Sequence, residues 1–215
     1  MKLREIYELA VNLGKRYDPR GDEVNACLKR EAEAYEALKS SDKEYYDLEA
    51  LSNPYSDTRI LHGKGDEPVE AVMTGIDIET PEILLADQLK RSGRKIDALI
   101  AHHPEGIAQA ALHQVMNVQA DMLEQAGVPI SIAEGIMESR IAEVHRTLMP
   151  LNHQRAVDAA RLLGIPFMCV HSPADNLVNH YLNQLMASNA YRTVGDVLEL
   201  LLTVPEFQTA RRLKA

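Results

Sequence analysis

Two adjacent histidines follow a short apolar segment near the middle of the chain. Residues 96–101 read Ile-Asp-Ala-Leu-Ile-Ala, and His102, His103 and Pro104 come directly after them. Proline has no N–H for a strand ladder, so it marks the end of a buried strand. Neutral imidazole binds zinc, nickel and other divalent ions. Neighbours on an extended segment point in opposite directions, so they would serve two metals more easily than chelate one, unless the backbone turns. The alternative is a pair of loop histidines, one hydrogen-bonded and one solvated.

Acidic and histidine residues also follow the other predicted strands. Asp77 comes after the strand pattern at 69–76, Glu134 after the pattern at 128–133, and His171 after the pattern at 166–170. The carboxyl ends of parallel strands lie on one edge of a sheet, and ligands bind in the crevice beyond that edge. We therefore expect these side chains, although distant in the sequence, to converge on a shared site with the two histidines.

The segment after the last predicted strand offers one more carboxylate. Residues 171–176 read His-Ser-Pro-Ala-Asp-Asn and lead into a helix, so Asp175 or Asn176 could simply be its N-cap. Alternatively, Asp175 bridges two cations through its two oxygens, forming the nucleus of a dinuclear centre that would support hydrolysis. The candidate metal ligands are therefore His102, His103 and Asp175, and the candidate catalytic groups are Asp77, Glu134 and His171.

Strand patterns alternate with helical patterns through the second half of the chain. The predicted helices there cover 81–92, 106–126, 135–148, 152–163, 176–188, 193–203 and 205–213. This alternation is typical of βαβ crossovers and a parallel sheet. Helical patterns at 2–14, 22–40 and 43–51 precede it. We predict an α/β fold with a mainly parallel sheet and flanking helices, divided into an N-terminal helical segment (1–52) and an α/β metal-binding domain (53–215).

Composition limits the partners and the setting. The chain of 215 residues has a formal net charge of −9, which argues against nucleic acid because phosphate binding needs a basic surface. Cys27 and Cys169 lie far apart and form no CxxC motif, so no disulfide framework is expected and a cytoplasmic setting is favoured. No segment approaches 18 uninterrupted apolar residues, so we expect no membrane span.

Several of these motifs together resemble a known family. The strand pattern ending at Asp77, the His102-His103-Pro104 tripeptide, and His171 four residues before Asp175 look like the NGG-one-interacting-factor-three family. Residues 57–63 resemble the loop ahead of that family's first strand. The resemblance covers roughly residues 54–180, and many members of the family are described as GTP cyclohydrolase I type II homologues.

The resemblance implies an α/β fold with a dinuclear site for divalent ions such as Zn, Mn, Fe or Ni. His102, His103 and Asp175 would be the ligands, with His171 beside them. It also implies a ring-like homo-oligomer, commonly a hexamer, and hydrolysis of a nucleotide-like or phosphorylated small molecule. The chain departs from the family in lacking a late histidine and glutamate and in carrying extra residues at 127–163, which resemble a longer, archaeal-type branch. Glu134, His153 or a neighbouring subunit could complete the site.

Two function hypotheses follow. The first is a metal-dependent hydrolase with two divalent ions. The second is a non-enzymatic scaffold or partner-binding protein that keeps the fold with an incomplete metal site, and the missing late cluster favours it. A nucleotide-binding or phosphate-binding module is disfavoured, because the sequence contains neither GxGxxG nor GxxxxGK[ST].

Overall fold

The computed structural model describes residues 1–213 of the chain, which form two compact units, one of residues 1–177 and the other from residue 178 onward. The strands are β1 (Arg59–His62), β2 (Val72–Gly75), β3 (Ala98–Ala101) and β4 (Phe167–Cys169). The helices are α1 (Leu3–Arg16), α2 (Glu23–Ala37), α3 (Ser40–Lys43), the 3₁₀ turn η1 (Leu48–Leu51), α4 (Thr80–Arg91), α5 (Gly106–Ala110), α6 (Leu112–Val115), α7 (Asn117–Gln125), α8 (Ile130–Leu148), α9 (Arg155–Leu163), α10 (Ser172–Ala187), α11 (Val194–Leu201) and α12 (Pro205–Leu213). Within residues 1–213, none of these helices has the length and apolarity that a bilayer crossing requires.

One sheet organises the first unit, with the strand order β1-β4-β3-β2. Strand β3 pairs in parallel with β2 on one side and β4 on the other, whereas β1 is antiparallel to β4. The two central strands are covered on both faces, which explains why their sequences are continuously apolar. The predicted α/β fold with a mainly parallel sheet and flanking helices is confirmed.

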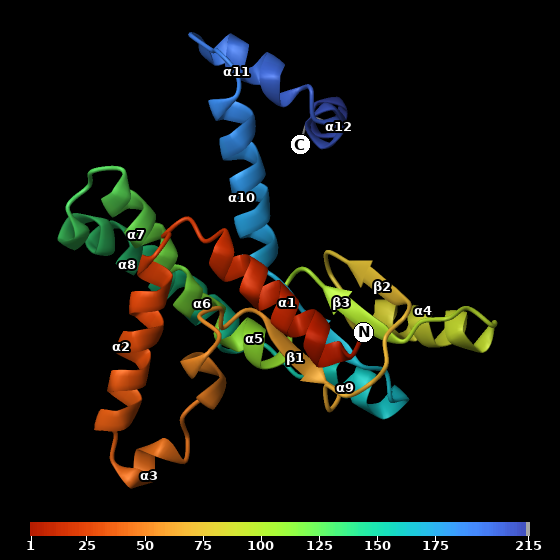
Figure 1. Ribbon diagram of the computed structural model, residues 1–215. Coiled ribbons are helices and arrows are strands. Elements are labelled where there is room, and N and C mark those ends of the chain that lie inside the picture. The colour runs from red at the N-terminus through yellow and green to blue at the C-terminus, as the bar shows by residue number, and fades with distance from the viewer. Residues whose placement is uncertain (214–215) are drawn as a thin grey trace. The chain divides into compact units, whose positions relative to one another are not determined.

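Successive residues of the central strands pack into opposite layers. Leu99 and Phe167 point into a core that α4 and α9 cover. Ala98 and Met168 point the other way, against apolar side chains of α1, which crosses the strands in Figure 1. The first helix of the chain is therefore one layer of the sheet structure. The proposed division at residue 52 stays a prediction.

The predicted strand at 128–133 is wrong. Residues from Ile130 onward belong to α8, which is 19 residues long and follows Pro129. The β-branched residues there are typical of a strand, but Ala133 and Met137 repeat at helical spacing and are buried in a small separate core against α7. This packing, visible as the α7–α8 pair in Figure 1, outweighs local propensity.

Two other features of the sheet unit differ from expectation. The edge strand β1 was expected to be a loop, because its four residues are too few to show a period. The single helix predicted over 106–126 is divided into α5, α6 and α7, with turns between them.

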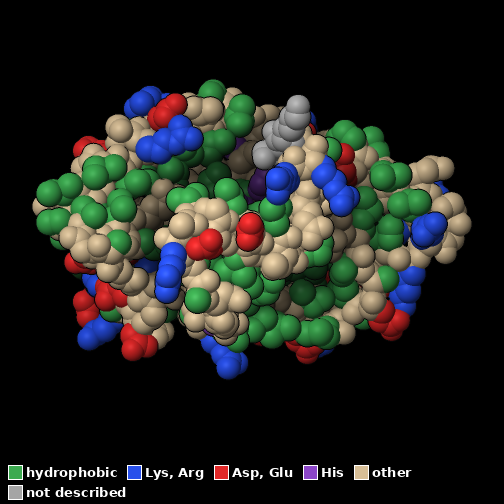
Figure 2. All heavy atoms as spheres, turned by 90° about the horizontal axis from the view of Figure 1, so that it is seen from above, with side chains coloured by type: hydrophobic (Ala, Val, Ile, Leu, Met, Phe, Trp, Pro, Cys, Tyr) green, Lys and Arg blue, Asp and Glu red, His purple; other side chains and the backbone are tan. Residues whose placement is uncertain are grey.

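On the face of the molecule shown in Figure 2, acidic and basic side chains are scattered among apolar ones rather than gathered by charge.

A pair of stacked histidines joins α6 to α8. The ring centroids of His113 and His145 are 4.1 Å apart with planes 23° from parallel. Burial lowers the pKa of His113, and the neighbouring His145 adds to this effect, while the backbone carbonyl of Ala110 acts more weakly in the opposite direction. The His113 ring is therefore best accommodated when neutral.

This stack predicts a pH dependence of stability. Unfolding restores the ordinary, higher pKa of His113, so below about pH 6.5 the unfolded chain binds more protons than the folded one and the free energy of unfolding falls. We expect the decline between about pH 7 and pH 5 to be shallower in His113→Gln than in the wild type, in urea titrations monitored by circular dichroism. Gln114→Ala, an exposed position on the same helix, is the control. Equal slopes for His113→Gln and the wild type would contradict this prediction.

Candidate metal centre

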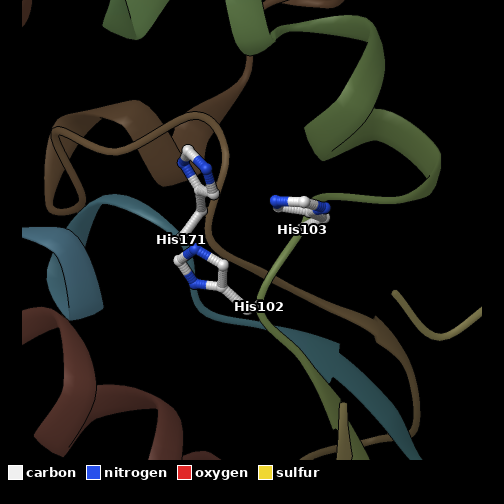
Figure 3. A group of neighbouring side chains, drawn as sticks. All are labelled: His102, His103 and His171. Carbon is white, nitrogen blue, oxygen red and sulfur yellow. The ribbon is translucent and has the colours of Figure 1, made fainter. Parts of the chain in front are cut away.

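Three imidazoles converge beyond the carboxyl ends of the two central strands. His102 and His103 follow β3, His171 follows β4, and one ring nitrogen from each lies within 4.8 Å of the others. Figure 3 shows the three rings, contributed by two segments, around a common space. Their centroids are 4.8 to 5.9 Å apart. Two imidazoles bound to one tetrahedral ion at about 2.0–2.1 Å would have centroids about 5 Å apart, so these rings fit a shared ion.

The backbone explains how two adjacent histidines can serve one ion. The amides of His102 and His103 continue the parallel ladder past β3 by donating to the carbonyls of Gly75 and Ile76, at 2.9 and 2.8 Å. The chain bends at both histidines instead of staying extended. Three residues later, Gly106 adopts a left-handed conformation with φ +59°, and a Cβ there would lie 2.8 Å from a methyl group of Val157. Glycine thus permits the abrupt turn into α5.

Each of the three rings has its Nδ1 directed at an oxygen. The acceptors are the carbonyl of Val170 for His102 at 3.3 Å, Asp77 Oδ1 for His103 at 2.7 Å, and Asp57 Oδ2 for His171 at 2.9 Å. A ring that donates its Nδ1–H in this way keeps Nε2 unprotonated as a potential ligand. The hydrogen bonds therefore select the tautomer that suits a cation in all three rings.

Asp175 brings a carboxylate to the same side of the rings. Its oxygens lie 3.5 Å from Nε2 of His102 and 3.8 Å from Nε2 of His171. Because α10 begins at Ser172, Asp175 lies within the first turn and is not the N-cap, so that alternative is wrong. The structure therefore brings together His102, His103, His171 and Asp175, as the sequence analysis expected.

Of the other two predicted catalytic residues, Asp77 lies beside the rings and Glu134 does not. Asp77 hydrogen-bonds the ring of His103, which makes it an orienting group for that imidazole. Glu134 lies on α8 and lines a separate cavity of about 660 Å³ with His113 and His145. Its expected place at this site depended on a strand at 128–133, and that strand is absent from the described residues. Glu134 is therefore withdrawn as an acid–base group here.

Asp57 is a functional residue that no strand pattern in the sequence indicated. This side chain is 0% exposed and accepts hydrogen bonds from His171 Nδ1, from Ser172 Oγ at 2.6 Å and from Thr58 Oγ1 at 3.2 Å. It lies just ahead of β1, the strand that was not predicted, so nothing placed it beside the end of β4. An aspartate that follows Pro-Tyr-Ser is typical of a turn. Only the resemblance of residues 57–63 to the family's loop pointed to a role for Asp57 at the site.

The electrostatic surroundings of the rings favour positive charge. Burial acts to lower the pKa of His171, but the hydrogen bond and charge of Asp57, together with the charge of Asp175, outweigh it and raise the pKa. Burial also raises the pKa of Glu105 to about 7, with Glu79 and Asp77 adding to the shift and Arg155 opposing it. The carboxylates of Asp57, Asp77 and Asp175 thus lie beside the imidazoles, an arrangement that a divalent cation would stabilise.

Comparison with known proteins supports the family resemblance. No protein-family model matches the chain, and neither does any curated protein. A solved structure described as a NIF3 superfamily protein from Sphaerobacter thermophilus is 28% identical, with a TM-score of 0.62. The match covers 70% of this chain and 55% of that one, so the present chain spans about half the length of its solved relative. The chain is therefore similar in both fold and sequence to a NIF3 superfamily protein, which is consistent with the family resemblance of its histidine motifs.

Proposed function

We propose that this chain is a metal-dependent hydrolase that holds a divalent ion between three imidazoles and one carboxylate. The observation that carries the proposal is the common orientation of His102, His103 and His171, whose Nδ1 atoms all face oxygens. Loop histidines without a shared ligand have no reason to adopt the same tautomer at one sheet edge. Asp175 would supply the fourth donor from the first turn of α10.

The donor set fits several divalent ions. Three imidazole nitrogens and one carboxylate oxygen suit four-coordinate zinc, and the same ligand types accept Mn, Fe or Ni. The second oxygen of Asp175 is available to bridge to another ion. Further ligands for a dinuclear site would come from a neighbouring subunit of a homo-oligomer, which the family resemblance implies. A divalent ion supplies Lewis acidity and lowers the pKa of a coordinated water, which permits hydrolysis near neutral pH.

The residues of the chain would orient the ligands and admit the substrate. Asp57 and Asp77 fix two of the rings by accepting hydrogen bonds from their far nitrogens. The side chains of His103 and Asp175 are 50% and 55% exposed, so a small molecule can reach this side of the site from solvent. The surrounding carboxylates would repel an anion, so a nucleotide-like or phosphorylated substrate would bind only after the cation has reversed the local charge.

A non-enzymatic scaffold is the second candidate function. Its support is that, among residues 1–213, the possible ligands gather in one group around His102, His103 and His171, which suits one ion rather than two. Such a protein would keep the fold and bind metal weakly, without turning over a substrate.

Elemental analysis of the purified protein, combined with a hydrolysis assay over a nucleotide panel, tests both candidates. We expect about one tightly held divalent ion per chain, none in the His102→Ala/His103→Ala variant, and hydrolysis that a chelator abolishes. Metal binding without turnover of any nucleotide would favour the scaffold. A wild-type protein that binds no divalent ion at all would refute the metal-dependent hydrolase.

A further inference from the structure

We propose that a buried hydrogen-bonded chain through Tyr55 positions Asp175 for metal binding, a role that rests on the proposed function of the site. The hydrogen bonds run from Asp18, after α1, through the Tyr55 hydroxyl to Asn176, the neighbour of Asp175 in α10. None of these three residues touches the imidazoles in any described contact, so they would act through the position of the helix.

Asn176 connects the first turn of α10 to the rest of the sheet unit. Its side chain is 7% exposed, and its amide donates to the carbonyl of Gly14 at 3.2 Å and to the Tyr55 hydroxyl at 3.3 Å. Because the two residues are consecutive, the backbone that carries Asp175 is held by the same contacts. The carboxylate of Asp175 can still rotate, but the position of its Cα is fixed.

The Asp18 end of this hydrogen-bonded chain is rigidly anchored. The Tyr55 hydroxyl donates to Asp18 Oδ2 at 2.8 Å, and the ring is 1% exposed. Arg20 binds both oxygens of Asp18 at 2.9 Å and also donates its backbone amide to Oδ1. A two-point guanidinium–carboxylate pair has a defined geometry, so the acceptor that Tyr55 meets is held in place. Burial and the charge of Asp18 raise the pKa of Tyr55, which keeps its hydroxyl protonated as a donor.

Close packing accompanies these hydrogen bonds. A Cβ on Gly14 would lie 2.8 Å from Pro173 and 2.9 Å from the Tyr55 ring, so only glycine allows α1 to meet the start of α10 at this distance. On the other side of the turn, Asp57 accepts hydrogen bonds from His171 and Ser172. The first turn of α10 is therefore held before Asp175 by Asp57 and after it by Asn176.

Small displacements matter at such a site. Ligands must be held within about 0.5 Å of the productive geometry by groups that pack and hydrogen-bond around them. Asp175 is 55% exposed, so its own surroundings do not restrain it strongly. The restraint must come through the backbone of α10, and the Tyr55 chain supplies it on the side of Asn176, as Asp57 does on the side of His171.

The test uses Tyr55→Phe, which removes one oxygen and keeps the ring. We expect the dissociation constant for Zn²⁺, measured by competition with a chelating dye, to rise about threefold to tenfold, less than the tenfold to hundredfold typical when a direct partner of a metal ligand is lost. Tyr46→Phe is the matched control, since Tyr46 also hydrogen-bonds a carboxylate, that of Glu31 in α2. Its affinity for Zn²⁺ should stay within about twofold of the wild type.

A double-mutant cycle separates positioning from general stability. If Tyr55 acts through Asp175, then Tyr55→Phe should have no further effect on Zn²⁺ affinity in the Asp175→Ala background. If Tyr55→Phe does not fold, Asn176→Ala replaces it in the same cycle and leaves the Asp18–Tyr55 hydrogen bond in place. An unchanged affinity with a lower melting temperature, or an effect that persists without Asp175, would overturn the proposal. A wild type that binds no Zn²⁺ would instead refute the proposed function.

Discussion

His102→Ala should weaken the binding of Zn²⁺ more than the roughly tenfold to hundredfold that is typical when only a hydrogen-bonded partner of a metal ligand is lost. The variant removes a ring whose Nε2 faces both the shared space and Asp175. The fold should survive, because the only described hydrogen bond of this side chain goes to the carbonyl of Val170, and a neutral hydrogen bond contributes about 1 kcal/mol.

Isothermal titration with Zn²⁺ after removal of endogenous metal would measure the effect. His62→Ala is the control, because His62 pairs with Phe167 at the start of β4, the opposite end of that strand from His171. We expect the control to bind Zn²⁺ as the wild type does. If His102→Ala retained wild-type affinity, the three rings would not share an ion, and the tautomer pattern would need another explanation.

Asp57→Asn should lower both metal affinity and stability, although Asp57 touches no ion. The amide offers one acceptor oxygen and no negative charge in place of the carboxylate, so the hydrogen bond that holds the Nδ1–H of His171 is weakened and the ring is less firmly oriented. We expect Zn²⁺ affinity to fall about tenfold to hundredfold. The free energy of unfolding should fall by about 2–3 kcal/mol, because a fully buried acceptor of charge-assisted hydrogen bonds is lost.

The matched control for this variant is Asp158→Asn. Asp158 pairs with Arg161 on the exposed side of α9, and surface pairs of this kind contribute little. Urea unfolding should show a change within about 0.5 kcal/mol for the control, and its Zn²⁺ affinity should match the wild type. If Asp57→Asn behaved like this control in both measurements, Asp57 would have no orienting role.

Both predictions depend on a site that was only partly visible in the sequence. His102, His103 and His171 were found because each follows an apolar run that forms a central strand, and parallel strands end on the same edge. Asp175 was found because it lies four residues beyond His171 in a helix that begins there. For the histidines a local pattern of a few residues was sufficient, since the strand itself carries each ring to its place.

Other features could not be derived from local patterns. Glu134 follows a β-branched segment that looks like a strand, yet the buried spacing of Ala133 and Met137 against α7 makes it a helix. Strand β1 has four residues and gains its identity from pairing with β4, more than 100 residues away in the chain. Packing partners that are distant in the sequence decided both outcomes.

The sequence by itself determined that three histidines would gather at the sheet edge, because hydrophobic runs and parallel order are local and topological properties. Only the tertiary structure decided which nitrogen of each ring is free, since that choice depends on acceptors such as Asp57, which lies 114 residues from His171. It also decided that α1 and the loop around Tyr55 support the first turn of α10. Hydrogen bonds between distant segments leave no period in a sequence, so a folded chain is needed to reveal them.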